Sequence, residues 1–257
     1  MCYETAQLAY KIYKEAKRLN ASDEEVEELH DKWKKLKGDA TSYYHVSGFD
    51  HPKLTSFTRE NGQLEVKQRT WGLIPHWVKD EEFANSLWNR TLLSRAESMH
   101  EKPSFRDALT KNRCIVPLDG FYEHFHKNGK TFPHFIQRQD NKRLFVGGLS
   151  SKWLNKETGV LMETLSLVTT KANDVMAEIH NNPKLKEGRM PLILSDDDAS
   201  IWLNDNADIT DLLAPNTSVP LKSWTVNKLK GKGYVGNIIE VQKEREYVEL
   251  NDPLTLF

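Results

Sequence analysis

The sequence predicts an α+β protein with a mostly antiparallel sheet and an N-terminal helical addition at about residues 4–37. From about residue 42, several segments alternate apolar and polar residues, which is the period of a half-buried strand. Asn128-Gly129 lies between two such segments, and this dipeptide favours a tight hairpin. The 257 residues contain no internal repeat and no long linker, so we expect a single domain over 1–257.

The helical addition is expected to contain two helices. Leu8, Ile12 and Leu19 recur at helical spacing among charged residues and predict the first helix, over 4–20. The stretch SDEE then has the pattern of a capping box, with Ser22 as the N-cap of a second helix that ends near Gly38. The apolar stripe of the second helix consists of Val26, Leu29, Trp33 and Leu36.

The rest of the chain predicts strands, with one further helix. The expected strand segments are LEVKQRTWGLI (64–74), the hairpin RCIVPLDGFYEHFHKNGKTFPHFIQR (113–138), RLFVGGLSSKW (143–153), METLSLVTTKA (162–172), MPLIL (190–194) and GNIIEVQ (236–242). The helix is expected within SDDDASIWL, where Ser195 is the N-cap.

Composition narrows the class of protein. No apolar run approaches membrane-spanning length and the N-terminus lacks a signal-peptide pattern, so we expect a soluble, cytoplasmic protein that does not bind membranes. The two cysteines form neither a disulfide framework nor a zinc motif. A net charge of −1 does not favour a general nucleic-acid binder. No cofactor and no obligate protein partner is indicated.

One segment is basic despite the balanced total. From Leu212 to Ile239 there is no acidic residue, and this segment is either a solvated loop or an edge that contacts phosphate. Its lysines are Lys222, Lys228, Lys230 and Lys232.

The chain begins MCYE, which places Cys2 where removal of Met1 would make it the first residue. It would then carry an α-amine, with an ordinary pKa of about 7.7–8.0, beside a thiol with an ordinary pKa of about 8.5. Both groups are partly deprotonated and nucleophilic near neutral pH. A 1,2-aminothiol condenses with an aldehyde to an imine, and the thiol then closes a thiazolidine ring. Without further context, a small residue at position 2 by chance is the simpler interpretation of Cys2.

Four motifs follow Cys2 in a fixed order, namely WGLIPHW (71–77), SRAESMHEKPSFRDAL (94–109), RCIVPLDGFYEH (113–124) and IHNNPKLKEGRMPLIL (179–194). Together with Cys2, they resemble the SRAP (SOS response-associated peptidase) family. The resemblance runs from about Tyr43 to Asn227, and residues 3–37 look like an insertion. It implies a barrel-like core with flanking helices.

The resemblance also implies a function. Family members bind single-stranded DNA and use the N-terminal Cys to capture the aldehyde of an abasic site as a thiazolidine crosslink. Cys2 would be the nucleophile, Glu123 the acid–base group and His180 a second proton donor or acceptor. Without the resemblance, Glu123 would read as an exposed strand carboxylate and His180 as a structural histidine.

DNA contacts are assigned by the same resemblance. Arg95, Arg106 and Arg189 would contact phosphate, since a guanidinium fork suits bidentate contacts, although each could instead form a surface ion pair. Trp71 would stack with an unpaired base, whereas Trp77 is expected in the core. The list of binding candidates is therefore Trp71, Arg95, Arg106 and Arg189.

The sequence departs from the family pattern in three places. The usual CGR start is CYE, and the family's Asn falls on Leu93, which cannot hydrogen-bond a sugar; Asn89 is a possible replacement. Extra residues also separate His180 from Arg189.

Two other functions remain open, a peptidase with Cys2 as nucleophile, and a DNA-binding module without chemistry. His124 and His126 could form a metal pair, but no third ligand is evident, so no metal is expected. Cys114 is expected to be a buried thiol.

Overall fold

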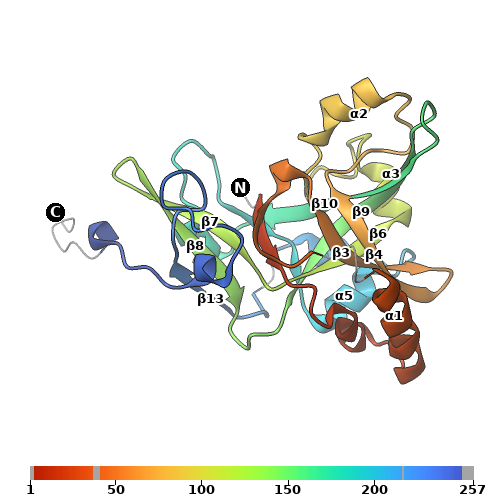
Figure 1. The fold of residues 1–257 in the computed structure, drawn as a ribbon, viewed down its shortest axis with the longest axis horizontal. Coiled ribbons are helices and arrows are strands. Elements are labelled where there is room, and N and C mark those ends of the chain that lie inside the picture. The colour runs from red at the N-terminus through yellow and green to blue at the C-terminus, as the bar shows by residue number, and fades with distance from the viewer. Residues whose placement is uncertain (1–2, 37–40, 216, 251–257) are drawn as a thin grey trace.

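Five strands form a closed barrel in the computed structural model, which describes residues 3–36, 41–215 and 217–250. The ring order is β9–β10–β4–β3–β6, and it closes because β9 pairs with both β6 and β10. Within this ring of five strands, only the β10–β4 pair is parallel. The bounds are β3 Lys53–Glu60, β4 Gln63–Trp71, β6 Arg113–Leu118, β9 Leu144–Leu154 and β10 Leu161–Lys171 (Figure 1).

A second, five-stranded antiparallel sheet lies beside the barrel, in the order β13–β8–β7–β1–β2 (Figure 1). Its hairpin turns at Asn128 and Gly129, whose φ angles of 51° and 72° are both in the left-handed region that the sequence predicts for this turn. The bounds are β1 Glu4–Gln7, β2 Tyr43–Ser47, β7 Gly120–Lys127, β8 Lys130–Arg138 and β13 Leu221–Thr225.

Three short strands extend the barrel and bring distant segments together. β5 (Leu93–Arg95) lies parallel to β10, and β11 (Arg189–Pro191) lies antiparallel to it. β12 (Ile193–Leu194) pairs with β9. Thr169 of β10 therefore has Arg95 on one side and Pro191 on the other.

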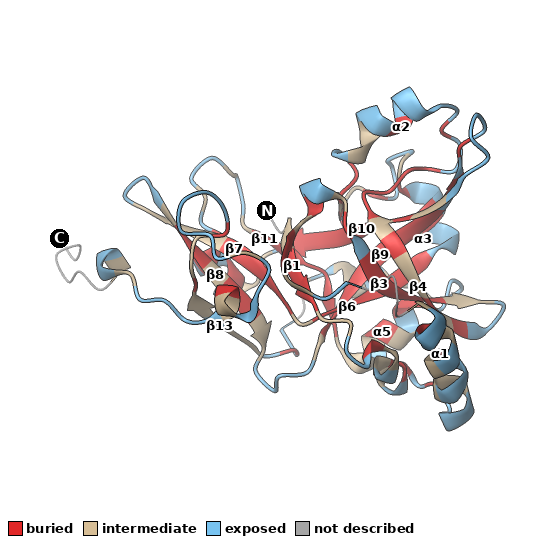
Figure 2. Cartoon of the chain, viewed as in Figure 1, coloured by how far each residue is buried: buried red, intermediate tan, exposed pale blue. Residues whose placement is uncertain are grey.

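Helices cover the outside of these sheets, and Figure 2 shows their outer faces exposed while the barrel strands are buried. The α-helices are α1 Asp23–Leu36, α2 Glu81–Trp88, α3 Arg106–Lys111, α4 Asp174–Ile179 and α5 Asp196–Trp202. The 3-10 helices are η1 Ile12–Leu19, η2 Gly48–Asp50, η3 Thr210–Leu213, η4 Ile239–Gln242 and η5 Val248–Leu250. In the described ranges, none of the helices is both long and apolar enough to cross a membrane.

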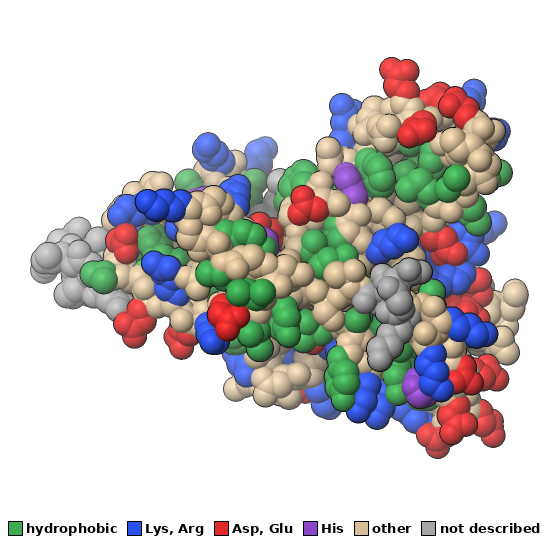
Figure 3. All heavy atoms as spheres, in the orientation of Figure 1, with side chains coloured by type: hydrophobic (Ala, Val, Ile, Leu, Met, Phe, Trp, Pro, Cys, Tyr) green, Lys and Arg blue, Asp and Glu red, His purple; other side chains and the backbone are tan. Residues whose placement is uncertain are grey.

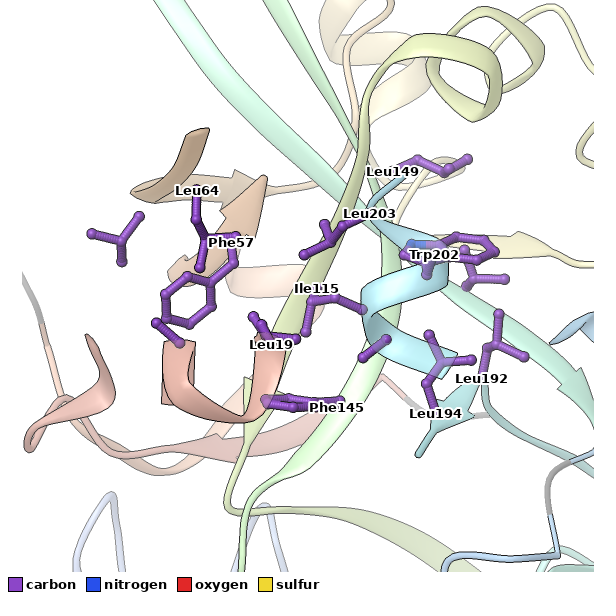
Figure 4. Close-up of a cluster of buried hydrophobic side chains, with 14 of the residues drawn as sticks. Leu19, Phe57, Leu64, Ile115, Phe145, Leu149, Leu192, Leu194, Trp202 and Leu203 are labelled. Atoms are coloured by element: carbon purple, nitrogen blue, oxygen red, sulfur yellow. The ribbon is translucent and has the colours of Figure 1, made fainter. Parts of the chain in front are cut away.

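The main core joins the barrel to η1 and α5 (Figure 4). Phe57 and Ile115 from the barrel pack with Leu19 of η1 and Trp202 of α5, and all four are almost completely buried. Burying each such side chain contributes roughly 1.5–3 kcal/mol to folding. The Trp202 indole nitrogen donates to the carbonyl oxygen of Cys114, so its polar atom is also satisfied.

The N-terminal prediction is half right. A helix was expected over 4–20, but residues 4–7 form β1 and residues 12–19 form a 3-10 helix. Pairing of β1 with both β2 and β7 satisfies its backbone on both edges, whereas a short helix is only marginally stable without tertiary packing. The second helix is confirmed, since Ser22 and Glu25 form the reciprocal capping bonds and the predicted stripe faces the core.

Further along the chain, the expected strand at 236–242 is wrong, because residues 239–242 form η4. The apolar residues Ile238 and Ile239 are exposed there, and Val241 alone is buried. The strand β13 was not predicted, because LKSWT is too short and too polar to stand out. The N-cap at Ser195 is confirmed, with a full capping box to Asp198. The predicted fold class, α+β with a mostly antiparallel, barrel-like core, is confirmed.

Candidate active site and DNA-binding surface

A carboxylate and an imidazole meet between the two sheets. Glu123 lies in β7 and His180 directly follows α4, and Oε2 of Glu123 is 3.4 Å from Nδ1 of His180. Both residues are almost completely buried, at 2% and 3% exposure. The other oxygen of Glu123 accepts the backbone N–H of His124 at 3.1 Å. The structure therefore brings together two of the three expected catalytic residues.

The ring of His180 is held by the backbone of Arg189. The N–H of Arg189 donates to Nδ1 at 3.0 Å, and the carbonyl oxygen of Arg189 lies 2.8 Å from the same nitrogen. When Nδ1 is unprotonated, it can accept a hydrogen bond from the N–H of Arg189. When it is protonated, it can donate to the carbonyl oxygen of Arg189 or to Glu123. The site thus offers a hydrogen-bond partner to Nδ1 in either state, as a group that gives and takes a proton needs.

Asn181 fastens this end of α4 to β7. Its side-chain oxygen accepts the N–H of His126 at 2.7 Å, and its amide nitrogen donates to the carbonyl of His126 at 3.0 Å. This reciprocal pair fixes the residue after His180 against the strand that carries Glu123. Sequence reasoning missed Asn181, since nothing in HNNP distinguishes it from its neighbour Asn182.

Arg189 forms a bidentate ion pair with Glu97. Both oxygens of Glu97 lie 2.9 Å from the guanidinium nitrogens, and the carbonyl of Thr169 accepts a further bond at 2.8 Å. Burial would raise the pKa of Glu97, but the hydrogen bonds and charge of Arg189 outweigh it and lower that pKa below its ordinary value. The fork that was expected to contact phosphate is thus engaged by a carboxylate, so a phosphate contact requires this pair to open.

The other two arginines are exposed. Arg95 ends β5 beside Thr169, which places it next to the Arg189 pair across one strand. Arg106 begins α3, outside the sheet, with Nε 3.5 Å from Asp107. Figure 3 shows that Lys and Arg on the viewed face are interspersed with Asp and Glu.

The two tryptophan expectations are corrected. Trp71 has no exposed surface, its indole nitrogen donates to the carbonyl of Leu92, and its ring lies against Gly48. A completely buried ring presents no face to a base, so Trp71 is a core residue. Trp77, expected in the core, is 38% exposed and contacts Phe83.

The remaining expectations concern the nucleophile and its neighbours. Cys2 lies outside the described residues. Cys114 is completely buried, which raises the pKa of its thiol to about 12, and the expectation of a buried thiol is confirmed. Leu93 is half-buried against the core, and Oδ1 of Asn89 lies 3.1 Å from Nε2 of His51. In the described residues, no group of His, Cys, Asp and Glu is arranged to hold a metal.

These features define an α+β barrel protein with a buried acid–base pair where the barrel meets a second sheet. The chain belongs to the SOS response associated peptidase (SRAP) family, whose sequence model matches residues 3–232. Abasic site processing protein YoqW of Bacillus subtilis is 38% identical over 164 residues, which cover 62% of this chain and 68% of YoqW. Abasic site processing protein YoaM of the same organism is 31% identical over 198 residues, covering 75% and 81%.

A more distant relative carries the same kind of name, and solved structures have a similar fold. Abasic site processing protein HMCES of Gallus gallus is 29% identical over 165 residues, covering 56% of this chain and 47% of that protein. A crystal structure of a protein from Bacteroides thetaiotaomicron superposes with a TM-score of 0.79 at 29% identity, covering 95% of this chain and all of that one. A protein from Bordetella bronchiseptica gives 0.69 at 25% identity, covering 88% and 100%.

Proposed function

We propose that the protein captures abasic sites in single-stranded DNA through Cys2, as part of a DNA damage response. Removal of Met1 exposes the α-amine. This amine condenses with the ring-opened aldehyde of the abasic sugar and releases one water molecule. The thiol then adds to the imine carbon, and its proton passes to the nitrogen, which closes a thiazolidine without a leaving group.

The observation that carries the proposal is the buried Glu123–His180 pair. Strand β1 connects this pair to the N-terminus. Glu4 of β1 lies opposite Tyr122 of β7 in an antiparallel register, so toward its N-terminal end β1 runs along β7 in the direction of Glu123. General acid–base groups are needed twice, to open the abasic sugar and to remove water from the carbinolamine. Glu123 and His180 would supply these protons.

The DNA strand would follow Arg95, which is exposed, toward Arg189. Arg95 lies one strand away from Arg189, and the backbone of Arg189 holds His180. Phosphate contacts of this kind position a strand without reading its sequence, and they weaken as salt increases.

The test uses an oligonucleotide with one abasic site. Wild type and Cys114→Ala should both give a heat-stable shifted band, whereas Cys2→Ala should give none. Intact mass establishes whether Met1 has been removed, because a retained Met1 blocks the amine. Equal adduct from wild type and Cys2→Ala would refute the proposal. Salt-sensitive strand binding without any adduct would instead favour a DNA-binding module.

A peptidase activity is the second candidate, favoured by the same pair. Once Met1 has been removed, Glu123 and His180 could assist acyl transfer from a peptide to Cys2, with the α-amine of Cys2 as base. In removal of Met1 itself that nitrogen is the leaving group, so Glu123 or His180 would act as the base. Repeated turnover of a peptide library would support a peptidase. A reaction that stops at one equivalent would favour crosslinking alone.

A further inference from the structure

A cavity of about 690 Å³ opens on the face of β7 that carries His124. Side chains alternate along a strand, so His124 points to the opposite face from Glu123. Glu4, His45, His124 and Tyr234 line this cavity, and none of these side chains has a role in the proposed chemistry of Cys2. Its volume falls within the roughly 300–1,000 Å³ of small-molecule sites.

Glu4 presents its carboxylate to the cavity between two imidazoles. Oε1 lies 3.5 Å from Nε2 of His45, and Oε2 lies 3.9 Å from Nδ1 of His124. Both separations are long for hydrogen bonds, so each oxygen keeps accepting capacity. Burial would raise the pKa of Glu4, but the two histidines and Lys230 outweigh it and lower that pKa, so the carboxylate is ionised at neutral pH.

The imidazole of His124 does not neutralise that charge. Burial lowers the pKa of His124 despite the nearby carboxylates, which leaves its ring uncharged at neutral pH. His45 is 7% exposed, and its Nδ1 is already paired with the hydroxyl of Tyr234 at 2.9 Å. Its other nitrogen, Nε2, is buried and has no hydrogen-bond partner among the described residues. The cavity therefore contains an ionised acceptor and an unsatisfied polar ring atom.

The rim combines aromatic surface with one cation. Phe49 is 52% exposed and Tyr234 is 37% exposed, and both line the cavity. Exposed rings of this kind stack with nucleobases. Lys230, from the basic segment noted in the sequence, lies at the same rim and can contact a phosphate.

We propose that this cavity binds the base of a nucleotide next to the captured abasic site, and that Glu4 selects guanine. One carboxylate can accept both adjacent donors of guanine, N1–H and N2–H, whereas adenine, thymine and cytosine each present at most one donor group on that edge. The inference rests on the proposed function. Glu4 is two residues from Cys2, at most about 7 Å along the chain, which is close enough for a neighbouring nucleotide.

The test measures equilibrium binding, so its outcome does not depend on crosslinking. Fluorescent oligo(dT) carries a tetrahydrofuran abasic analogue, which has no aldehyde, flanked on one side or the other by dG, deoxyinosine, dA or dC. We expect dG to bind wild type about tenfold more tightly than dA on one of the two sides. Deoxyinosine, which lacks the N2 donor, should fall between them.

Three variants separate selection of the base from folding and from stacking. Glu4→Gln should remove the preference for dG, while Glu157→Gln, in an exposed turn, should keep it. Phe49→Ala should weaken binding of every oligonucleotide and keep the preference, as expected of stacking. Equal affinity of wild type for all four bases, or a dG preference that survives Glu4→Gln, would overturn the inference. Either result would leave adduct formation by Cys2 unaffected, so failure of the two proposals can be told apart.

Discussion

Nδ1 of His180 lies 3.4 Å from a carboxylate oxygen of Glu123, and the two side chains come from the end of helix α4 and from strand β7 of the second sheet. The strand β7 carries Glu123, whereas the barrel strands β10 and β11 and helix α4 position His180. Acid–base chemistry at this pair therefore depends on how the barrel and the second sheet are held together.

The pair itself can be tested by isosteric substitution. Glu123→Gln and His180→Gln should each slow adduct formation by about 10²-fold or more, the usual range for a lost general acid or base. Single-turnover kinetics with abasic oligonucleotide would measure this rate. Because the two groups act together, the double variant should lose little more than either single one. Fully additive losses would mean that they act independently.

We infer that Asn181 positions His180, since both of its hydrogen bonds to His126 hold the end of α4 against β7. Asn181→Ala removes both bonds to His126 and should slow adduct formation and alter its pH profile, because His180 would no longer be fixed against Glu123. Asn182→Ala is the matched control, since that side chain accepts a hydrogen bond from the N–H of Lys184 in its own turn. A purely structural role for Asn181 would lower stability and leave the shape of the pH profile unchanged.

The Glu97–Arg189 pair predicts a dependence of stability on pH. Arg189 lowers the pKa of Glu97 from its ordinary 4.5, so the folded state binds the proton less readily than the unfolded state. This contribution is fully present above the unfolded pKa and is lost as pH falls through the lower, folded pKa. Wild type should therefore be more stable than Glu97→Gln at neutral pH, and the difference should shrink below about pH 4.

Urea unfolding of wild type and Glu97→Gln, at neutral pH and below about pH 4, would measure the difference in stability. Glu157→Gln should show no such change, because its side chain lies in an exposed turn. A difference between wild type and Glu97→Gln that is constant with pH would contradict the role assigned to the pair.

Trp71 should behave as a core residue. Trp71→Ala removes a completely buried indole and its bond to the carbonyl of Leu92, so it should cost about 3–5 kcal/mol of unfolding free energy. The smaller change Trp71→Phe should lower stability while leaving the affinity for single-stranded DNA nearly unchanged, provided that the protein is still folded. Loss of affinity at unchanged stability would instead restore the stacking role.

Local sequence patterns determined much of the fold. The Asn128-Gly129 turn, the N-caps at Ser22 and Ser195 and the long alternating strands depend on neighbours in the chain, and each is found as predicted. The family's ordered motifs likewise single out Glu123 and His180 as catalytic candidates, and the structure places them together. The motifs carry this information because the chemistry requires particular residue types.

Only the tertiary structure decided which residues face one another. Residues 4–7 are a strand because β2 and β7 supply their hydrogen bonds, and Trp71 is buried because the barrel closes over it. The Arg189–Glu97 pair and the Asn181 clamp join segments far apart in the chain, so no local pattern could reveal them. Sequence sets local backbone preference and residue chemistry, whereas long-range packing selects which polar groups meet and which side chains lose their contact with water.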